Sequence, residues 1–406
     1  MSLIKRIALI TTWFPPQESV ATNRMLAFAE FLSETYEIEV FCLSQEEKSI
    51  DWETNICVHY STSNELLERL NDKTTDGILL HKIKVATRIL LSKVIPNPLL
   101  KWQRSSLEKL KKRHQEKSFD CIISSYSPQE AHLVAIEFKK EFKNIPWIAD
   151  MRDEMAANPY LDKNTKNHLL AIEKEVNEYA DALTSVSEPI IIDFQKSLPK
   201  IRYFEEIRNG FNHNFRRAVT NEAKNSVFTL GYFGSFYGKR KPTILLEALK
   251  QLIAEKSDFD FRLEIIGAHQ NFTVPLEISP KIQLKAPLNY LEAIQKMAMM
   301  DANIQIHPKS EQKGIFTGKL FDYISVQKPV LAFVDTEDVA AQLIQSFNCG
   351  YVAEFSDIEA NKKVILEVFN DWKVNRIKYA NNEQVRSLHR KNQVQKLAQL
   401  IEKLIE

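Results

Sequence analysis

The sequence FTLGYF at residues 228–233 decides the fold of this chain. It is an uncharged, mainly apolar run that ends at Gly234, which is typical of a strand buried on both faces of a sheet. A helical period over 243–253 follows, and a second apolar run at 262–266 ends at Gly267. Strand, helix and strand in this order predict a parallel βαβ unit with a glycine after each strand.

The same alternation extends through the rest of the chain. We expect further strands at 6–11, 37–43, 121–125, 147–150, 182–186, 302–306 and 330–334. We expect further helices at 23–33, 130–142, 165–179, 291–300 and 318–326, the second of them introduced by a Ser127 cap and Pro128. Asn209 and Gly210 mark a turn where the pattern restarts. The sequence therefore predicts an α/β fold of two Rossmann-like doubly wound domains, 1–207 and 208–384.

Bulk composition excludes several classes of function. The 406 residues carry a formal net charge of +1, which gives no general attraction for nucleic acid. The four cysteines form no CxxC pair, which argues against a zinc or redox motif and suits a reducing compartment. No run approaches the roughly 18 uncharged apolar residues of a membrane span. We therefore expect a cytoplasmic protein, or one bound to a membrane surface.

In doubly wound sheets, ligands bind beyond the carboxyl ends of the strands. In the first half of the chain, that rule selects residues 13–16, 124–128 and 150–153. In the second half it selects residues that follow predicted strands or open the next helix: Gly234, Ser235, Gly267, His307 and Thr317. Two such edges that face each other form a cleft, so the architecture predicts a ligand between the two domains.

The strongest local signal is TGKLFDY at residues 317–323. Thr317 and Gly318 open a predicted helix, whose free amides and dipole favour a phosphate, and Lys319 adds a positive charge beside them. Asp322 shares a helix face with Lys319 and could accept hydrogen bonds from ribose hydroxyls. The alternative is a solvated Lys319–Asp322 pair on an ordinary helix. A P-loop does not fit, because no Ser or Thr follows the lysine.

The second signal is GYFGSFYGKRKP at residues 231–242. A strand ends at Gly234 and Ser235, and the loop beyond carries three consecutive cations with Arg240 at their centre. Glycine lets the backbone approach a ligand, and the cations suit a diphosphate. The alternative is a tight turn with a solvated basic cluster.

The third signal is DMRD at residues 150–153, which places three charges at the end of a predicted strand. We interpret these three charges, Asp150, Arg152 and Asp153, as groups that orient a sugar or its acceptor. The alternative is an exposed loop that contains an Asp–Arg ion pair.

Two further matches predict no site. Asp258 and Asp260 have the DxD spacing of metal-dependent transferases, but they enter a strand at the wrong end of the sheet. The nine histidines show no metal-ligand spacing, and we interpret His307 as a plain loop residue at a strand end. No metal site is therefore predicted.

The segment 78–113 combines many apolar residues, Trp102 and a series of lysines and arginines. A stretch of this composition can lie on an anionic membrane surface. The alternative is a pair of core-facing helices whose lysines extend to solvent. The sequence alone leaves both interpretations open.

Together these motifs resemble those of glycosyltransferase family 4, the retaining enzymes of the GT-B fold, over most of the chain. The matching segments are WFPP at 13–16 with Asn23 and Arg24, DMRD at 150–153, ADALTSVS at 180–187, NGFN at 209–212, GSFYGKR at 234–240, and TGKLFDY at 317–323 with KPV at 328–330. The resemblance also implies that a last helix, 385–406, packs back on the N-terminal domain. The order and spacing of these short matches make the set specific.

The resemblance assigns roles by position. Arg240 falls where the family keeps a phosphate-binding lysine, and Lys319 falls near the phosphates. Asp322 falls on the second Glu of the E-x7-E signature, which binds ribose. The first Glu, which contacts the donor sugar, falls on Gly314 and is absent, and Glu311 and Lys313 are the nearby residues that could substitute for it. The arginine usual after the loop glycine is Ser235 here, and the glycine pair of the family's opening loop is also missing.

The resemblance thus implies a metal-independent retaining glycosyltransferase with its acceptor on the N-terminal domain. The nucleotide-sugar, linked to UDP or GDP, is a substrate rather than a cofactor. We expect the donor to bind at Gly234, Ser235, Arg240, Gly267, Thr317, Gly318, Lys319 and Asp322. We expect Arg152, Asp153, Arg240 and Lys319 to serve catalysis.

Family members of this pattern commonly build capsule, O-antigen or exopolysaccharide on a lipid carrier at the inner face of the membrane. The expected acceptor is therefore a saccharide or a lipid-linked saccharide, and 78–113 could contact the membrane surface. Two alternatives stay open: a GT-B nucleotide-sugar epimerase, and a catalytically silent GT-B partner protein. The second is favoured by Gly314 and Ser235.

Overall fold

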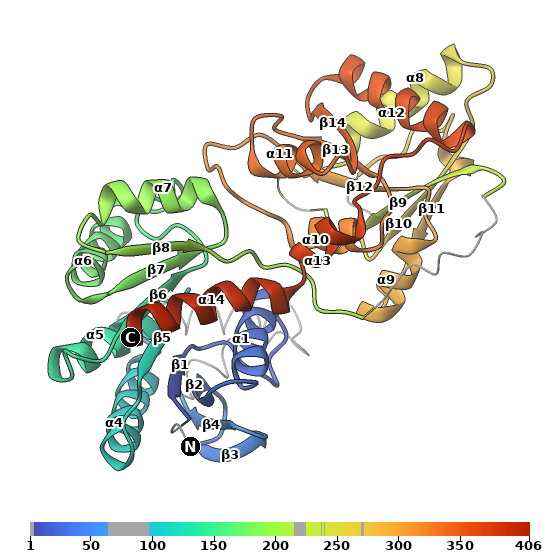
Figure 1. The fold of residues 1–406 in the computed structure, drawn as a ribbon. Helices are drawn as coiled ribbons and strands as arrows, with labels where there is room; N and C mark the ends of the chain where they lie inside the picture. Colours follow the sequence, from blue (N-terminus) through green and yellow to red (C-terminus); the bar gives the residue numbers. More distant parts are fainter. Residues whose placement is uncertain (1–3, 64–96, 215–224, 237, 239, 269–271) are drawn as a thin grey trace, which may run out of the picture. The chain divides into compact units, whose positions relative to one another are not determined.

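The computed structural model describes residues 4–63, 97–214, 225–236, 238, 240–268 and 272–406 (Figure 1). The chain divides into two compact units. Unit 1 contains Met1–Ile207 and Val394–Glu406, and unit 2 contains Arg208–Gln393. Each unit is built on one mainly parallel sheet, which confirms the predicted α/β class of two Rossmann-like doubly wound domains.

The sheet of unit 1 has the strand order β3-β4-β2-β1-β5-β6-β7-β8. Its strands are β1 (Arg6–Ile10), β2 (Glu37–Leu43), β3 (Lys48–Glu53), β4 (Ile56–Ser61), β5 (Cys121–Tyr126), β6 (Trp147–Met151), β7 (Ala182–Ser185) and β8 (Tyr203–Glu206). All neighbouring strands are parallel except β3, which is antiparallel to β4. The order reverses between β1 and β5, which are neighbours in the sheet although far apart in the chain.

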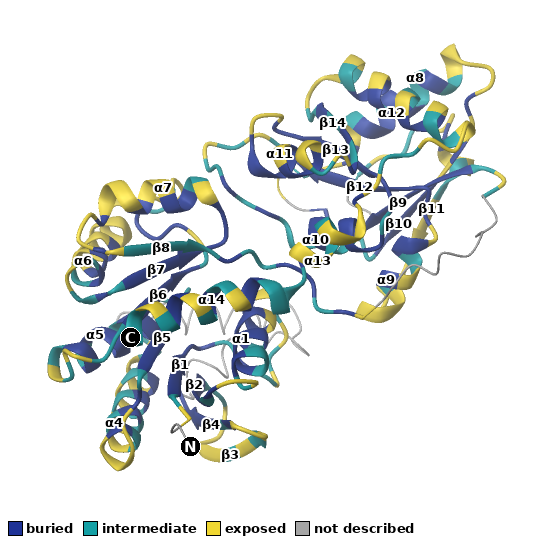
Figure 2. Cartoon of the chain, in the orientation of Figure 1, coloured by how far each residue is buried: buried dark blue, intermediate teal, exposed yellow. Residues whose placement is uncertain are grey.

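Helices cover both faces of this sheet. They are α1 (Val20–Leu32), α4 (Leu100–Glu116), α5 (Glu130–Glu141), α6 (Lys163–Tyr179), α7 (Glu188–Ser197) and α14 (Arg390–Ile405). Alternate residues of β1 point to opposite faces of the sheet. Ala8 and Ile10 belong to the core under α4 to α7, while Ile7 and Leu9 belong to the core under α1 and α14. Because both faces are covered, β1 is buried along its whole length (Figure 2).

The sheet of unit 2 is parallel throughout its described pairs, in the order β11-β10-β9-β12-β13-β14. Its strands are β9 (Phe228–Phe233), β10 (Phe261–Ile266), β11 (Ile282–Lys285), β12 (Ala302–His307), β13 (Val330–Val334) and β14 (Gly350–Glu354). Its helices are α8 (Thr243–Glu255), α9 (Tyr290–Ala298), α10 (Gly318–Ser325), α11 (Val339–Ser346), α12 (Ile358–Lys373) and α13 (Asn382–Ser387). Leu230 and Tyr232 pack toward α8 and α12, and Phe233 packs toward α9, α10 and α11.

Two local expectations differ from the structure. Helix α5 begins at Glu130 with Gln129 as its N-cap, so the predicted cap at Ser127 is wrong by two residues. Helix α1 begins three residues before the predicted start at Asn23, because the Ser19 side chain accepts a hydrogen bond from the Thr22 amide and so caps it. The sequence prediction lacked five strands: β3, β4, β8, β11 and β14. The residues of β3, β8, β11 and β14 are the more exposed ones at or near sheet edges, whereas β4 is mostly buried between β3 and β2.

Candidate functional site

The order of strands in unit 2 reverses between β9 and β12. From β9 the chain adds β10 and β11 on one side, then returns to add β12, β13 and β14 on the other. The pairing of β9 with β12 covers only two residue pairs, Leu230 with Ala302 and Gly231 with Asn303. The amide of Phe233 instead donates to the Tyr323 hydroxyl at 3.2 Å. The carboxyl ends of β9 and β12 therefore separate, which is the place where open α/β sheets bind ligands.

Gly234 follows β9 and lies directly under the side chain of Lys319. Its backbone has φ +105°, a conformation that residues with a Cβ rarely adopt. A Cβ added there would lie 2.6 Å from Lys319 Nζ and 2.8 Å from Lys319 Cε. The same ammonium lies 4.7 Å from the ring centre of Tyr232. The missing side chain of Gly234 therefore makes room for the Lys319 ammonium at the end of β9.

Lys319 is held in an environment that disfavours its positive charge. Burial, and to a lesser degree the charge of Arg240, lower the pKa of Lys319 to about 8. No carboxylate of the described residues lies within ion-pair distance of its ammonium. The charged form of a half-buried lysine close to a second cation is stabilised by an arriving anion, because the anion supplies the missing opposite charge.

Arg240 is in hydrogen-bond contact with His307. Its guanidinium lies 2.8 Å from Nδ1 of His307, the last residue of β12. Burial and the charge of Arg240 lower the pKa of His307 to about 4, so the imidazole is neutral at physiological pH. The sequence interpretation of His307 as a plain loop residue is therefore wrong: it ends a strand and contacts a candidate site residue. Its 67-residue separation from Arg240 along the chain hid this contact from sequence reasoning.

Helix α10 begins at the same edge of the sheet. Thr317 is its N-cap, and the Thr317 side chain makes no capping hydrogen bond. Its hydroxyl has no hydrogen-bond partner among the described residues. The first amides of a helix, here those of Gly318 and Lys319, have no carbonyl partner one turn earlier and carry the positive end of the helix dipole. Space is open around Gly318, where an added Cβ would meet no atom within 4 Å.

Two further predicted residues line the loop ends beside this helix. Gly267 follows β10, has φ +83°, and would place a Cβ 3.7 Å from the Cα of Gly234. The Ser235 hydroxyl donates to the Gly267 carbonyl at 3.3 Å. The predicted donor residues Gly234, Ser235 and Gly267 therefore lie together at the carboxyl ends of β9 and β10.

Asp322 lies one turn beyond Lys319 on α10. Its Oδ1 accepts a hydrogen bond from the Tyr290 hydroxyl at 2.8 Å. Burial raises the pKa of Asp322 to about 6, while Tyr290 and the positive charge of Arg390 oppose that rise. Tyr290 opens α9, and sequence reasoning did not identify it. Asp322 thus remains a hydrogen-bond acceptor at neutral pH, next to a tyrosine hydroxyl.

Gly314 occupies the position where the resemblance expects the first glutamate of the E-x7-E signature. It has φ +84°, and its amide donates to Asp338 Oδ1 at 2.8 Å. Lys313, considered as a substitute for the missing glutamate, forms an ion pair with Asp335. Glu311, the other candidate, is exposed. The loop is therefore built around a glycine conformation and not around a sugar-contacting carboxylate.

In unit 1, Asp150 is a buried structural residue. It is fully buried, and its carboxylate accepts hydrogen bonds from Arg24 Nε and Nη2 at 3.1 and 2.7 Å, and from the Ser125 and Thr184 hydroxyls, both at 2.8 Å. These four bonds saturate the carboxylate. Arg24 and the two hydroxyls hold the pKa of Asp150 below its usual range against the effect of burial. Asp150 is therefore not a group that orients a sugar.

Arg152 and Asp153 follow β6 at the carboxyl edge of the unit 1 sheet. They form an ion pair at 3.2 Å, and the Asp153 side chain is 56% exposed. Trp13, from the loop after β1, donates through its indole to the Ser127 carbonyl at 2.7 Å. The loops that the crevice rule selected after β1 and β5 are thus in contact with each other in unit 1.

The DxD match lies at the amino end of β10, as the sequence indicated. Asp258 forms an ion pair with Lys373 at 2.6 Å. Asp260 forms an ion pair with Lys281 and caps the Phe261 amide. Both carboxylates therefore have partners of their own, at the edge of the sheet opposite the candidate site.

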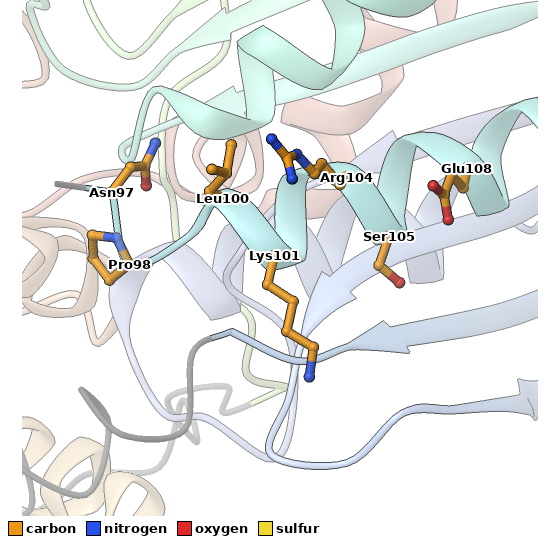
Figure 3. A pocket seen from close by; sticks show the side chains of 7 residues that line it. All are labelled: Asn97, Pro98, Leu100, Lys101, Arg104, Ser105 and Glu108. Carbon is orange, nitrogen blue, oxygen red and sulfur yellow. The ribbon is translucent and has the colours of Figure 1, made fainter. Parts of the chain in front are cut away.

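Of the segment 78–113, residues 78–96 lie outside the described residues. The described part forms most of α4, in which Trp102 and Leu110 are buried in the unit 1 core. A pocket of about 390 Å³ lies along the start of this helix, and Figure 3 shows the side chains that line it. It is lined by Asn97, Pro98, Leu100, Lys101, Arg104, Ser105 and Glu108. For residues 100–113 the structure thus favours the core-facing alternative, and no helix in the described ranges is long and apolar enough to cross a membrane.

Solved structures of other proteins share this architecture, although no match was found in sequence. No protein-family model matches the chain, and no curated protein matches it in sequence. Similar solved structures include a glycosyltransferase from Rickettsia africae, with a TM-score of 0.62 and 13% identity over 100% of both chains. An Escherichia coli structure described as trehalose-6-phosphate bound with UDP-2-fluoro glucose has a TM-score of 0.64 and 11% identity over 99% of both chains.

The lipopolysaccharide outer core galactosyltransferase WaaB, in its apo form, is a third similar structure. Its TM-score is 0.58 at 14% identity, over 98% of this chain and 99% of that one. Similarity at such low identity concerns the fold and extends over nearly all of each chain. The chain therefore has the GT-B fold.

Proposed function

We propose that this protein is a glycosyltransferase that moves a sugar from a nucleotide-sugar donor, bound by unit 2, to a saccharide or lipid-linked acceptor. The observation that carries the proposal is the pairing of Lys319 and Arg240 at the reversal of strand order in unit 2. The positive charge of Arg240 contributes to lowering the pKa of both Lys319 and His307, and the Lys319 ammonium lies over the glycine turn after β9. Two cations beside a helix N-terminus suit a diphosphate.

The remaining residues of the site suit the other parts of a nucleotide-sugar. Asp322, one turn further along α10, is an acceptor for ribose hydroxyls. The open space at Gly318 and the turns at Gly234 and Gly267 allow phosphate oxygens to approach the backbone. In this proposal the order along α10 matches the order of the ligand: phosphates at the first turn and ribose at the second.

The proposed chemistry is sugar transfer with retention of anomeric configuration. The bond between the anomeric carbon and the diphosphate oxygen breaks, and a bond to an acceptor hydroxyl oxygen forms. The hydroxyl proton passes to the departing diphosphate. Lys319, Arg240 and the first amides of α10 stabilise the negative charge that grows on the diphosphate, which is the part a metal ion plays in other transferases.

We place the acceptor at the carboxyl edge of the unit 1 sheet, near Arg152 and Asp153. Asp153 is exposed there and can accept hydrogen bonds from sugar hydroxyls. A lipid-linked acceptor would put the protein at the inner face of the membrane, in the synthesis of a cell-surface polysaccharide such as capsule or O-antigen. Contact of residues 78–96 with that membrane belongs to the same proposal.

Thermal-shift titration with UDP, GDP, CMP and their sugars tests the donor site. A nucleotide at about 100 times its dissociation constant should stabilise the folded state by about 2.7 kcal/mol. Lys319→Ala should abolish that stabilisation. Lys373→Ala, which removes an exposed lysine at the opposite end of β10, is the matched control and should retain it. The stabilising nucleotide then defines the donor for an acceptor screen.

A catalytically silent GT-B protein is the second candidate, and Gly314 favours it. The residue that contacts the donor sugar in the related family is replaced by a glycine in a conformation that disfavours any other residue. If the wild-type protein responds to no nucleotide, the donor-site proposal is wrong and the silent form is supported. Release of an epimerised nucleotide-sugar without an acceptor would instead identify the epimerase.

A further inference from the structure

The contact between His307 and Arg240 is a feature of the site that the proposed function does not use. His307 ends β12, where it pairs in register with Val334 of the central neighbour β13. Its side chain is buried, and the residue is 8% exposed. Its ring position is therefore fixed by the sheet, whereas Arg240 lies in the loop between β9 and α8.

The hydrogen bond between them defines the state of the imidazole. A guanidinium has only donors, so His307 Nδ1 must accept the hydrogen bond at 2.8 Å and the ring proton must lie on Nε2. A protonated ring would place two positive charges in contact and would lose the acceptor. Burial and Arg240 both favour the neutral form, and they lower the pKa of His307 to about 4.

Two carboxylates whose charges act on His307, Asp335 and Asp338, have other partners. Asp335 forms an ion pair with Lys313. Asp338 accepts hydrogen bonds from the Gly314 and Val339 amides, both at 2.8 Å. Both act on His307 only as distant charges that oppose the lowering of its pKa.

A neutral partner has a specific consequence for an anion-binding arginine. A carboxylate partner would orient the guanidinium equally well. It would, however, cancel the positive charge of the guanidinium and compete with a phosphate for the same N–H donors. An imidazole Nδ1 occupies one donor and, being neutral, does not itself cancel the positive charge of the guanidinium. Orientation and charge are thus supplied separately, by His307 and by Arg240.

We propose that His307 is a positioning residue, which fixes the Arg240 guanidinium for the diphosphate of the donor without neutralising it. This inference rests on the proposed function, because it requires that unit 2 bind a nucleoside diphosphate. It predicts that His307 acts on phosphate recognition alone and only through Arg240. Recognition of the nucleoside is independent of it.

The test measures the affinity for the nucleoside diphosphate that stabilises the wild type, by calorimetry, and for the corresponding nucleoside, by NMR titration. His307→Leu should weaken diphosphate binding about tenfold, the effect of losing one oriented charge-assisted contact. The nucleoside affinity should not change. His307→Asn, whose side-chain oxygen can replace Nδ1 as a neutral acceptor, should stay within about threefold of the wild type. His307→Asp should weaken diphosphate binding, because its carboxylate neutralises Arg240.

A double-mutant cycle separates positioning from a general structural role. In an Arg240→Met background, His307→Leu should cause no further loss of diphosphate affinity. Additive losses, an unchanged affinity in His307→Leu, or an equal loss of nucleoside affinity would each overturn the inference. Thermal midpoints of the ligand-free variants, close to that of the wild type, establish that the variants are folded. Failure of the wild type to bind any nucleoside diphosphate would instead contradict the proposed function itself.

Discussion

The ammonium group of Lys319 occupies the space that a side chain on Gly234 would fill. The Nζ atom lies 2.6 Å from the position of a Cβ on that glycine, closer than two non-bonded atoms can approach. The glycine after β9 and the lysine of α10 are 85 residues apart in the chain and are matched to each other in the fold. The absence of a side chain at one position permits the charge at the other.

Gly234→Ala should therefore impair the site in two ways. The new methyl group displaces the Lys319 ammonium, and an alanine at φ +105° is strained, which costs about 1–3 kcal/mol of stability. We expect at least a tenfold loss of nucleotide affinity in calorimetric titration, by analogy with the loss of one charged contact. Gly318→Ala controls for folding stability alone, because an added Cβ there meets no atom within 4 Å. Its nucleotide affinity is not compared, since Gly318 belongs to the proposed phosphate site. Unchanged nucleotide affinity in Gly234→Ala would show that Lys319 does not contact the ligand.

Nucleotide affinity should be greatest between about pH 6 and pH 8. Asp322 has a pKa of about 6, so as the pH falls through that value it loses its negative charge and becomes a weaker hydrogen-bond acceptor. Lys319 has a pKa of about 8 in the free protein and loses its positive charge as the pH rises through that value. An anion binds the protonated lysine, so binding above pH 8 requires proton uptake and weakens.

The two limbs of this profile are separable by substitution. Asp322→Asn should flatten the acid limb, since an amide does not titrate, apart from the contribution of the phosphate itself. Lys319→Arg should move the alkaline limb beyond pH 10, because arginine stays charged. Isothermal titration from pH 5 to pH 9.5 gives both limbs. A profile that is level from pH 7 to pH 9.5 in the wild type would exclude Lys319 as the titrating cation.

Lys319→Met should raise the stability of the ligand-free protein while it abolishes nucleotide binding. The folded pKa of Lys319 lies below its unfolded value, so at pH 7 folding disfavours its charged form. Removing the charge should stabilise unit 2 by about 1–2 kcal/mol, after subtraction of the contact with the Tyr232 ring. Hydrogen exchange of the β9 amides measures this locally.

The pH dependence of the same experiment checks its cause. Between pH 8 and about 10.4 the unfolded lysine holds its proton and the folded one does not, so wild-type stability should rise with pH. The gain from Lys319→Met should shrink over the same range. Lys373→Met, an exposed lysine paired with Asp258, should change stability by less than about 0.5 kcal/mol. A destabilised Lys319→Met at pH 7 would contradict the proposed burial of an uncompensated charge.

The sequence predicted the sheets of both units because their central strands are apolar on both faces. The predicted strands at 228–233 and 330–334 coincide with β9 and β13, and 302–306 falls one residue short of β12. Edge strands such as β3 and β11 were missed because they lack a continuous apolar run. In β3 and β11 the residues are mostly exposed or half-buried, so no apolar run marks them.

Residues of the candidate site were predictable where a local pattern marks them: Gly234 and Gly267 follow apolar strands, and Arg240 lies in a basic loop. Thr317, Gly318, Lys319 and Asp322 follow one another at the start of a helix, and the helix period alone places them on one side. His307 and Tyr290 join the site through contacts with Arg240 and Asp322 that span 67 and 32 residues. Such contacts depend on strand order, which the pattern of apolar residues does not specify.

The same limit explains the interpretation of residues 150–153. Three charges after a strand predicted a polar loop, yet the first of them, Asp150, is the last but one residue of β6 and points into the fold. Its partner Arg24 lies 126 residues earlier in the chain. Position at a strand end did not distinguish a buried ion pair from an exposed site, because the partner was not visible in the local sequence.

Removing one partner of the Arg24–Asp150 pair should destabilise unit 1 by about 3–5 kcal/mol, because the other charge is then buried without compensation. Arg24 also donates to the Ile207 carbonyl at 2.7 Å, so Arg24→Met removes a link between α1 and the end of the unit. Arg152→Met is the matched control, because it removes a cation just after β6 whose ion-pair partner, Asp153, is exposed. This substitution should cost less than about 1 kcal/mol of stability. Hydrogen exchange in β5, β6 and β7 measures the difference in stability between the two variants.

The pH dependence of the buried pair follows from the pKa of Asp150. Because that pKa lies below its usual range, the contribution of the pair to stability should persist through neutral pH and disappear only as the pH falls through the lowered value. Equal effects of the two substitutions on exchange would show that the buried pair does not hold these strands together.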